Sequence, residues 1–400
     1  MAISTLDLPQ PIRRRPQVAP RDFAKRDRAI ELFDAGDYAE SVAETLRYLL
    51  PGVPIPDLTA EALCFEQGSA RVRAEIDAQG FSLSTVLAAL TPEAQVTAAL
   101  RFFLSRISAT GQVFQPRLRG EVVTLEFRDP LPLLHPVKLG EVLQRLPMEA
   151  DNNDAWMVRE FGVATPDRAE MTPLSADEFE RALAIWEGHW AAVDELMTES
   201  RRRRSVRFLD ALGSYAANQV RYTLPLYGSL RARIQEASDT YTDKDEHPNK
   251  RDSVLAKAIK EMRQVGADEL RACLGHARYA INPLQEGTPS LLSSLLGGQR
   301  MQTTGELRAV GRSLEAALEL IADYLYLLAY HSWPADIEAT LRQGLDQASG
   351  KPWREAADGL WNHANAIVRT YGSHGERDRE EDADADDADG ASLYDQESQR

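Results

Sequence analysis

Hydrophobic and polar residues repeat along this chain with two different periods, and the change of period divides it. Between about residues 25 and 165, stretches of helical spacing enclose stretches of strict alternation. In 70–77, for example, Val72, Ala74 and Ile76 fall on one side and charged residues on the other. A period of two with one polar side is typical of an antiparallel strand solvated on one face. From 173 to 375, spacings of three and four indicate helices.

The N-terminal pattern predicts an α+β domain at 25–165 with one antiparallel sheet and the order α-β-β-β-α-β-β-α. Its first helical stretch should break or kink at Gly36, and its last helix should open at His135-Pro136. Cys64, in the short apolar strand Ala62–Phe65, is expected in the core. The hairpin around Gly120 contains Pro116, which predicts an edge strand or a bulge.

The second region predicts a helical bundle domain at 173–375 with five to seven helices. Ser175 and Glu178 form a capping box before a stripe that contains Trp186 and Trp190. Further helices are expected at 201–222, at 254–277, along the apolar stripe from Leu307 through Val310 to Leu328, at 337–345 and at 353–368. The polar stretches 239–250 and 286–305 are expected to be loops, the second with room for a short helix.

The N-terminal order, together with the run from Gln95 to Leu146 and the Leu131-Pro132-Leu133 entry to its last helix, resembles the type III secretion chaperone-like fold, including YbjN-type proteins. The resemblance covers about residues 25–165. Members of that group bind other proteins, often as dimers, and perform no catalysis. The resemblance implies a non-enzymatic adaptor, chaperone or assembly factor of a bacterial cytoplasmic system, whose partners are other proteins or a second copy of the chain.

Charge is unevenly distributed over the 400 residues. The formal net charge is −16, and residues 376–400 contribute −8 of it through eleven acidic residues and three arginines. Such a segment repels itself and has little to bury, which predicts a disordered acidic tail. Residues 1–24, with four prolines and the triplet Arg13–Arg15, predict a disordered basic arm. The overall acidity argues against a general affinity for nucleic acid.

Composition and motifs exclude several classes of protein. No apolar run reaches the length of a membrane span, so no integral membrane segment is expected. Two cysteines cannot make a disulfide framework, which fits a cytoplasmic protein. The phosphate-binding, dinucleotide-binding, nucleophile-elbow and zinc-protease motifs are missing, so no enzyme, cofactor or metal is predicted. Cys273 and His276, three apart on an expected helix, leave an enzymatic alternative open.

The candidate contact residues each have a structural alternative. Protein contacts are expected at the sheet edge near Pro116, at His135 and Lys138, and at Trp186 and Trp190, which equally fit an edge strand, a helix cap and a core. An anion contact is expected at the cluster Arg201, Arg202, Arg203 and Arg204, which Glu195 and Glu199 could instead pair at a solvated helix start. An alternative function is a stress- or phage-response component whose helical domain senses a small ligand or membrane surface through Leu291–Leu296.

Overall fold

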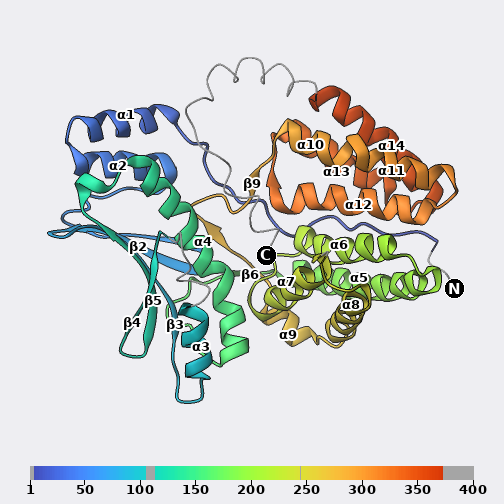
Figure 1. Ribbon diagram of the computed structural model, residues 1–400, viewed down its shortest axis with the longest axis horizontal. Helices are drawn as coiled ribbons and strands as arrows, with labels where there is room; N and C mark the ends of the chain where they lie inside the picture. The colour runs from blue at the N-terminus through green and yellow to red at the C-terminus, as the bar shows by residue number, and fades with distance from the viewer. Residues whose placement is uncertain (1–3, 105–112, 244, 373–400) are drawn as a thin grey trace. The chain divides into compact units, whose positions relative to one another are not determined.

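The computed structural model describes residues 4–104, 113–243 and 245–372 (Figure 1). An antiparallel sheet with helices is followed by a helix-rich region, so the predicted fold class is confirmed. The acidic segment 376–400 lies outside the described residues.

Two antiparallel helices precede the sheet, and the break between them lies where the sequence predicts it. α1 (Phe23–Asp34) begins at the cap Asp22, whose Oδ1 accepts a hydrogen bond from Ala24 N at 3.1 Å. Gly36 then adopts a φ of +83°, which an L side chain rarely tolerates. α2 (Tyr38–Leu49) follows and buries Val42, Leu46 and Leu49.

The sheet has six strands in the order β4-β5-β3-β2-β1-β8, and all neighbours are antiparallel. The strands are β1 (Leu63–Gly68), β2 (Ala70–Asp77), β3 (Gly80–Ala89), β4 (Gln115–Arg119), β5 (Val122–Asp129) and β8 (Arg278–Tyr279). Val72 and Ala74 are buried, as their alternation predicts. Cys64 is exposed, so its expected place in the core is wrong: alternation along β1 buries Leu63 and Phe65 and turns the residue between them outward.

β8 comes from far along the chain and no local pattern predicts it. The side chain of Gln67 holds the chain just after β8 through two hydrogen bonds to the backbone of Ile281. Its Nε2 donates to Ile281 O at 3.0 Å, and its Oε1 accepts from Ile281 N at 2.9 Å. Gln67 is fully buried, so the N–H and the C=O of its side-chain amide both depend on these bonds.

Three helical elements complete this part of the chain: α3 (Val96–Phe102), the short 3₁₀ helix η2 (Leu131–Leu133) and α4 (Pro136–Phe161). The inward side of α4 carries Leu139, Val142, Leu143 and Leu146, all fully buried against the sheet core. α4 continues past Pro147 to Phe161. Its Asp151 carboxylate reaches the tight β1–β2 turn, where Oδ1 accepts from Ser69 N at 2.7 Å, while Oδ2 accepts from Arg231 at 3.2 Å.

The rest of the described chain is mostly helical. Its helices are α5 (Ala176–Arg203), α6 (Val206–Thr223), α7 (Gly228–Thr242), α8 (Pro248–Met262), α9 (Ala267–Ala272), α10 (Pro289–Leu296), α11 (Gly298–Ala309), α12 (Ser313–Tyr330), α13 (Ala335–Ala348), α14 (Trp353–Ile367) and the π-helical turn η3 (Val368–Gly372). Two-residue strands pair between them: β6 (Thr172–Pro173) with β7 (Gly275–His276), and β9 (Gln285–Glu286) with β10 (His331–Ser332).

Several predicted boundaries in this region are wrong. The stretch 286–305 is not a loop, because Thr288 Oγ1 caps α10 by accepting from Leu291 N at 3.2 Å and α11 starts two residues after α10 ends. The predicted loop 239–250 is taken up at both ends by helix, because α7 runs to Thr242 and α8 begins at Pro248. Val310 leaves the apolar stripe, because the turn between α11 and α12 exposes it. The capping box before α5 is confirmed: Glu178 N donates to Ser175 Oγ at 3.2 Å.

Packing divides the chain into two compact units. The sheet unit comprises residues 10–194 and 223–283, and the helical unit comprises the described parts of 1–9, 195–222 and 284–400. The predicted domain boundaries, 25–165 and 173–375, stay predictions. Residues 4–22 are not a free arm: Leu6 and Leu8 are buried in the helical unit, and in the sheet unit Ile12 N and Arg13 N both donate to Thr223 O. Apolar residues before and between the prolines give this segment something to bury.

Candidate functional site

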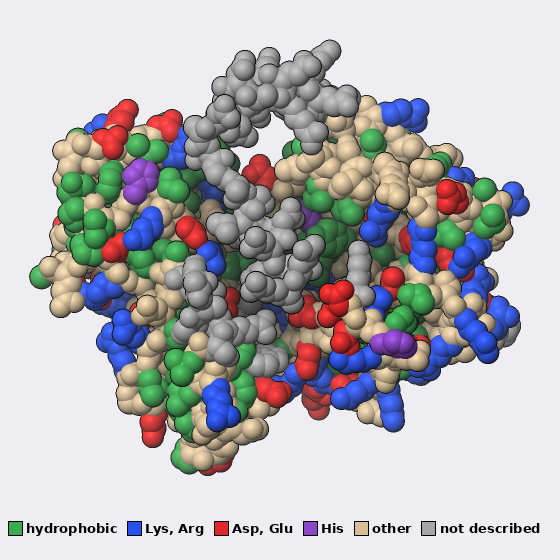
Figure 2. Space-filling model, in the orientation of Figure 1, with side chains coloured by type: hydrophobic (Ala, Val, Ile, Leu, Met, Phe, Trp, Pro, Cys, Tyr) green, Lys and Arg blue, Asp and Glu red, His purple; other side chains and the backbone are tan. Residues whose placement is uncertain are grey.

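Two of the most exposed large apolar side chains lie where η2 leads into α4, in the sheet unit. Leu133 is 64% exposed and Val137 is 71% exposed. Beside them the ring of Phe33 lies 5.1 Å from that of His135 and 5.3 Å from that of Tyr38, measured between centroids. These five residues form what we call the α4 surface. Figure 2 shows hydrophobic side chains gathered among charged ones where Figure 1 places α1 and α2.

The backbone under the α4 surface is fixed by polar contacts. His135 is the cap of α4, as the sequence predicts, and its Nδ1 accepts from Val137 N at 3.2 Å. Lys138 forms an ion pair with Asp129 at the end of β5 and lies over the ring of Phe127 at 5.9 Å. His135 and Lys138 are therefore brought together at one place, and both hold the first turn of α4.

Pro116 lies in the outermost strand of the sheet, as predicted for an edge. β4 pairs with β5, where Pro116 is opposite Leu125, and among the described residues β4 has no second neighbour. Proline cannot donate a backbone hydrogen bond, so it is tolerated in such a strand. Leu118 in the same strand is 51% exposed. A protein contact at this edge stays a prediction.

Trp186 and Trp190 are both buried in the sheet unit. Their rings lie 5.7 Å apart, and Trp186 Nε1 donates to Met262 O at the end of α8 at 3.1 Å. The core alternative is therefore the one that the structure supports. A contact through either tryptophan would require this packing to open.

The arginine cluster predicted at 201–204 lies at the end of α5, so its expected place at a helix start is wrong. Arg204 has a φ of +53°, which ends the helix, and Ser205 then starts α6 by accepting from Phe208 N through Oγ at 3.2 Å. Arg202 donates Nε and Nη2 to the Glu199 carboxylate, at 2.8 and 2.6 Å. This hydrogen-bonded pair holds the pKa of Glu199 down, at about 2.

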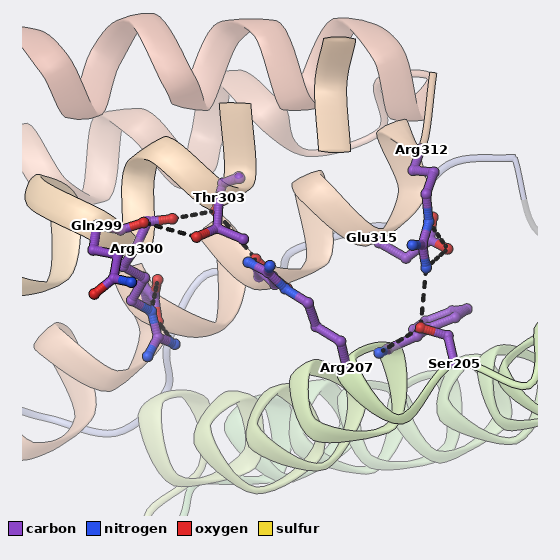
Figure 3. A network of polar contacts seen from close by, with 11 residues as sticks. Ser205, Arg207, Gln299, Arg300, Thr303, Arg312 and Glu315 are labelled. Carbon is purple, nitrogen blue, oxygen red and sulfur yellow. Dashed lines mark hydrogen bonds and ion pairs between the residues drawn. The ribbon is translucent and has the colours of Figure 1, made fainter. Parts of the chain in front are cut away.

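Three buried carboxylates on α12 form ion pairs with further arginines of the helical unit (Figure 3). Glu315, Glu319 and Asp323 are spaced by four residues and so lie on one face of the helix. The ion pairs are Arg203 and Arg312 with Glu315, Arg207 with Glu319, and Arg300 with Asp323. Sequence reasoning missed this row, although an acidic residue at every fourth position of an apolar helix was a visible signal.

The row joins helices rather than offering chemistry. Arg203 and Arg207 come from α5 and α6, and Arg300 and Arg312 come from α11 and the turn after it. Each carboxylate is engaged by at least one guanidinium. Breaking a buried pair leaves an uncompensated charge, which is costly. The row therefore stabilises the packing of α5 and α6 against α11 and α12.

Asp323 gives the row a pH dependence. Burial raises its pKa to about 7, against the lowering effect of Arg300 and with a smaller raising effect of Glu319. The folded chain therefore keeps this proton up to about pH 7, whereas the unfolded chain releases it near its ordinary value of 3.8. Between those pH values the folded state binds more protons, so this carboxyl makes stability fall as pH rises.

We expect Asp323→Asn to remove this contribution. Between pH 4 and 7 the free energy of unfolding of the native chain should fall relative to that of the variant, by at most about 1.4 kcal/mol per pH unit. Above about pH 8 the difference should be constant. Urea denaturation of both proteins across pH 4–9 measures it. Parallel stability curves over the whole range would contradict the assignment.

Cys273 and His276 do not share a helix, as the enzymatic alternative requires. Cys273 is buried at the end of α9 and its Sγ lies 3.6 Å from Ser229 Oγ. His276 belongs to β7 rather than to a helix shared with Cys273, and its Nε2 lies 3.7 Å from Glu178 Oε1. Burial lowers the pKa of His276, more than the carboxylate of Glu178 raises it. The expectation that both lie on one helical face is wrong, because α9 ends at Ala272.

Within residues 4–104, 113–243 and 245–372, no cluster of histidine, cysteine, aspartate and glutamate has the arrangement of a metal site. The helices in those ranges include none with the length and apolarity needed to cross a membrane.

Comparison with protein-family models, with curated proteins and with solved structures finds no match to this chain. The likeness of residues 25–165 to secretion chaperone-like and YbjN-type proteins stays an expectation. Any function is therefore argued from the geometry described above.

Proposed function

We propose that this protein is a non-enzymatic adaptor, chaperone or assembly factor of a bacterial cytoplasmic system, and that the α4 surface is where it binds another protein. The observation that carries the proposal is the exposure of Leu133 and Val137 on a backbone held by the His135 cap and the Lys138–Asp129 pair. Binding is favoured when a partner covers apolar groups that are held exposed to water, because burying them lowers the free energy.

The expected gain is large enough to matter. Full burial of a leucine or valine side chain contributes about 1.5–3 kcal/mol, and about 1.4 kcal/mol is a tenfold change in affinity. Both side chains begin more than 60% exposed. The half-buried rings of Phe33 and Tyr38 lie in the same surface, and aromatic rings are enriched among residues that dominate binding. A second copy of the chain is one partner that this surface could take.

The alternatives have less support. Sensing of a ligand or membrane through Leu291–Leu296 would need exposed leucines, but Leu292 and Leu296 of α10 are buried. Catalysis at Cys273 would need a base bonded to it, but the contacts found are Cys273 Sγ with Ser229 Oγ and His276 Nε2 with Glu178 Oε1.

We expect the double substitution Leu133→Asp and Val137→Asp to abolish partner binding while leaving the fold intact, because both side chains point into solvent. Tagged full-length chains, native and substituted, would be recovered from the source cell and their co-purified proteins quantified. The native chain should retain a reproducible partner that the variant loses at least tenfold, since about 1.4 kcal/mol or more of burial is removed.

Val310→Asp is the matched control, because Val310 is also 71% exposed but belongs to the helical unit. This variant should retain the partner at the native level. Equal recovery with the double variant, or a native chain that retains no protein, would contradict the proposal.

A further inference from the structure

Four helix ends meet at one end of the helical unit and bring arginines together there. α5 ends and α6 begins at residues 203–206, and α11 ends and α12 begins at 309–313. Arg312 Nη2 donates to Ser205 Oγ at 3.0 Å and joins the two turns (Figure 3). We call the arginines of this end the arginine surface: Arg202, Arg203, Arg204, Arg207, Arg308 and Arg312. Two helices start here and two end, so their dipoles offset each other.

Negative charge lies inside this end and positive charge outside. The carboxylates of Glu199, Glu315 and Glu319 are at most 10% exposed, whereas the side chains of Arg202 and Arg312 are 71% and 41% exposed. The buried carboxylates hold the guanidinium groups from behind. Figure 2 shows lysine and arginine side chains gathered at the right-hand edge of the view, where α5 ends and α12 begins in Figure 1. The face turned to solvent is therefore basic and already ordered.

Each of these guanidinium groups keeps a donor that the ion pairs do not use. Arg202 bonds Glu199 through Nε and Nη2, and Arg312 bonds Glu315 and Ser205 through the same two nitrogens. Nη1 of both has no partner among the described residues. Arg207 leaves Nη1 in the same way, and Arg203 leaves Nη2. The guanidinium of Arg204 has no partner within the described part of the chain.

Two valines border the arginine surface. Val206 at the start of α6 is 47% exposed and Val310 is 71% exposed. A ligand for this place would carry several negative charges and some small apolar groups. Carboxylates suit the remaining Nη donors of fixed arginines, because carboxylate oxygens can accept these N–H groups.

We propose that the arginine surface binds the acidic segment 376–400 of the chain itself, from the same molecule or from a second copy. This segment has eleven acidic residues and three arginines, and alanines separate several of the carboxylates. It follows Gly372 in the sequence, and a tether raises the effective concentration of a segment of the same chain to the millimolar range. The segment fits this surface by its sequence and by charge complementarity, independently of the α4 surface.

Charge complementarity favours this occupant over nucleic acid. The chain carries a net charge of −16, which repels a free polyanion at long range. A tethered segment is already close to the surface and does not have to approach against this repulsion. Occupied by the segment, the arginine surface would be closed to other anions.

The test uses full-length chains with a photoreactive residue, Val310→p-benzoylphenylalanine. After illumination at 50 mM salt, the adducts are mapped by mass spectrometry, and they should lie within residues 376–400. The yield should fall about fivefold or more at 500 mM salt, because exposed charge pairs are screened. Arg202→Glu with Arg204→Glu should lower it similarly, and so should amide substitutions at Glu380, Glu381, Asp382, Asp384, Asp386, Asp387 and Asp389.

The matched control places the same photoreactive residue at Val137, which is equally exposed but lies in the sheet unit. Its adducts with 376–400 should be few and should not respond to the amide substitutions. Adducts of Val310 outside 376–400, or a yield that neither salt nor either set of substitutions changes, would overturn the proposal. A lost partner at the α4 surface would leave this result unaffected, so the two proposals fail separately.

Discussion

Replacing Gly68 by alanine should lower the free energy of unfolding of the sheet unit by about 3 kcal/mol. Gly68 closes the turn between β1 and β2 with a φ of +60°, a conformation that costs an L residue about 1–2 kcal/mol. An added Cβ would also lie 2.0 Å from Asp151 Oδ1, which cannot move without leaving Ser69 and Arg231. Overpacking of this kind costs a further 1–3 kcal/mol or so. Chemical denaturation of native and variant chains measures the sum.

Gly36→Ala separates the two causes. Gly36 also has a positive φ, of +83°, but no atom lies within 4 Å of the position of its Cβ. It should therefore cost only the backbone term of about 1–2 kcal/mol. Equal losses at Gly36 and Gly68 would show that the Asp151 contact contributes nothing to the turn.

Glu319→Ala should destabilise the helical unit by about 3 kcal/mol, because breaking a buried ion pair leaves its partner uncompensated. The Glu319 carboxylate is 8% exposed, accepts two hydrogen bonds from Arg207, and accepts a third from Thr304 Oγ1 at 3.1 Å. Its loss also removes one of the links between α6 and α12. Thermal or urea unfolding followed by the tryptophan signal would measure the change.

Asp358→Ala is the comparison for this second effect. Asp358 pairs with Arg308 in the same unit, but its side chain is 48% exposed. Exposed ion pairs contribute about 1 kcal/mol or less. If Glu319→Ala lowers the free energy of unfolding no more than Asp358→Ala does, the carboxylate row does not stabilise the helical unit as proposed.

The features that the sequence predicts well are local ones. Alternation in 70–77 places Val72 and Ala74 inside, Pro116 marks an edge strand, and the Ser175–Glu178 box starts α5. Each depends on neighbours in sequence and on the geometry of one element. Cys64 shows the limit of composition alone, because an apolar neighbourhood did not decide which side of β1 it faces.

The features that the sequence does not predict depend on distant partners. β8 joins the sheet through Gln67 and Ile281, which are 214 residues apart. Leu6, Leu8 and Ile12 order the N-terminal segment only because other parts of the chain receive them. The arginines at 201–204 were visible as a cluster, but their carboxylate at Glu315 lies on α12. No local pattern could assign that pair.

The most direct test of the protein-binding proposal is photocrosslinking from the α4 surface inside the source cell. Full-length chains would carry Val137→p-benzoylphenylalanine or, for comparison, the same substitution at Val158, which is 38% exposed near the end of α4. We predict a discrete protein adduct from position 137 that is much weaker from position 158. The same diffuse products from both positions, or no protein adduct from position 137, would contradict the account.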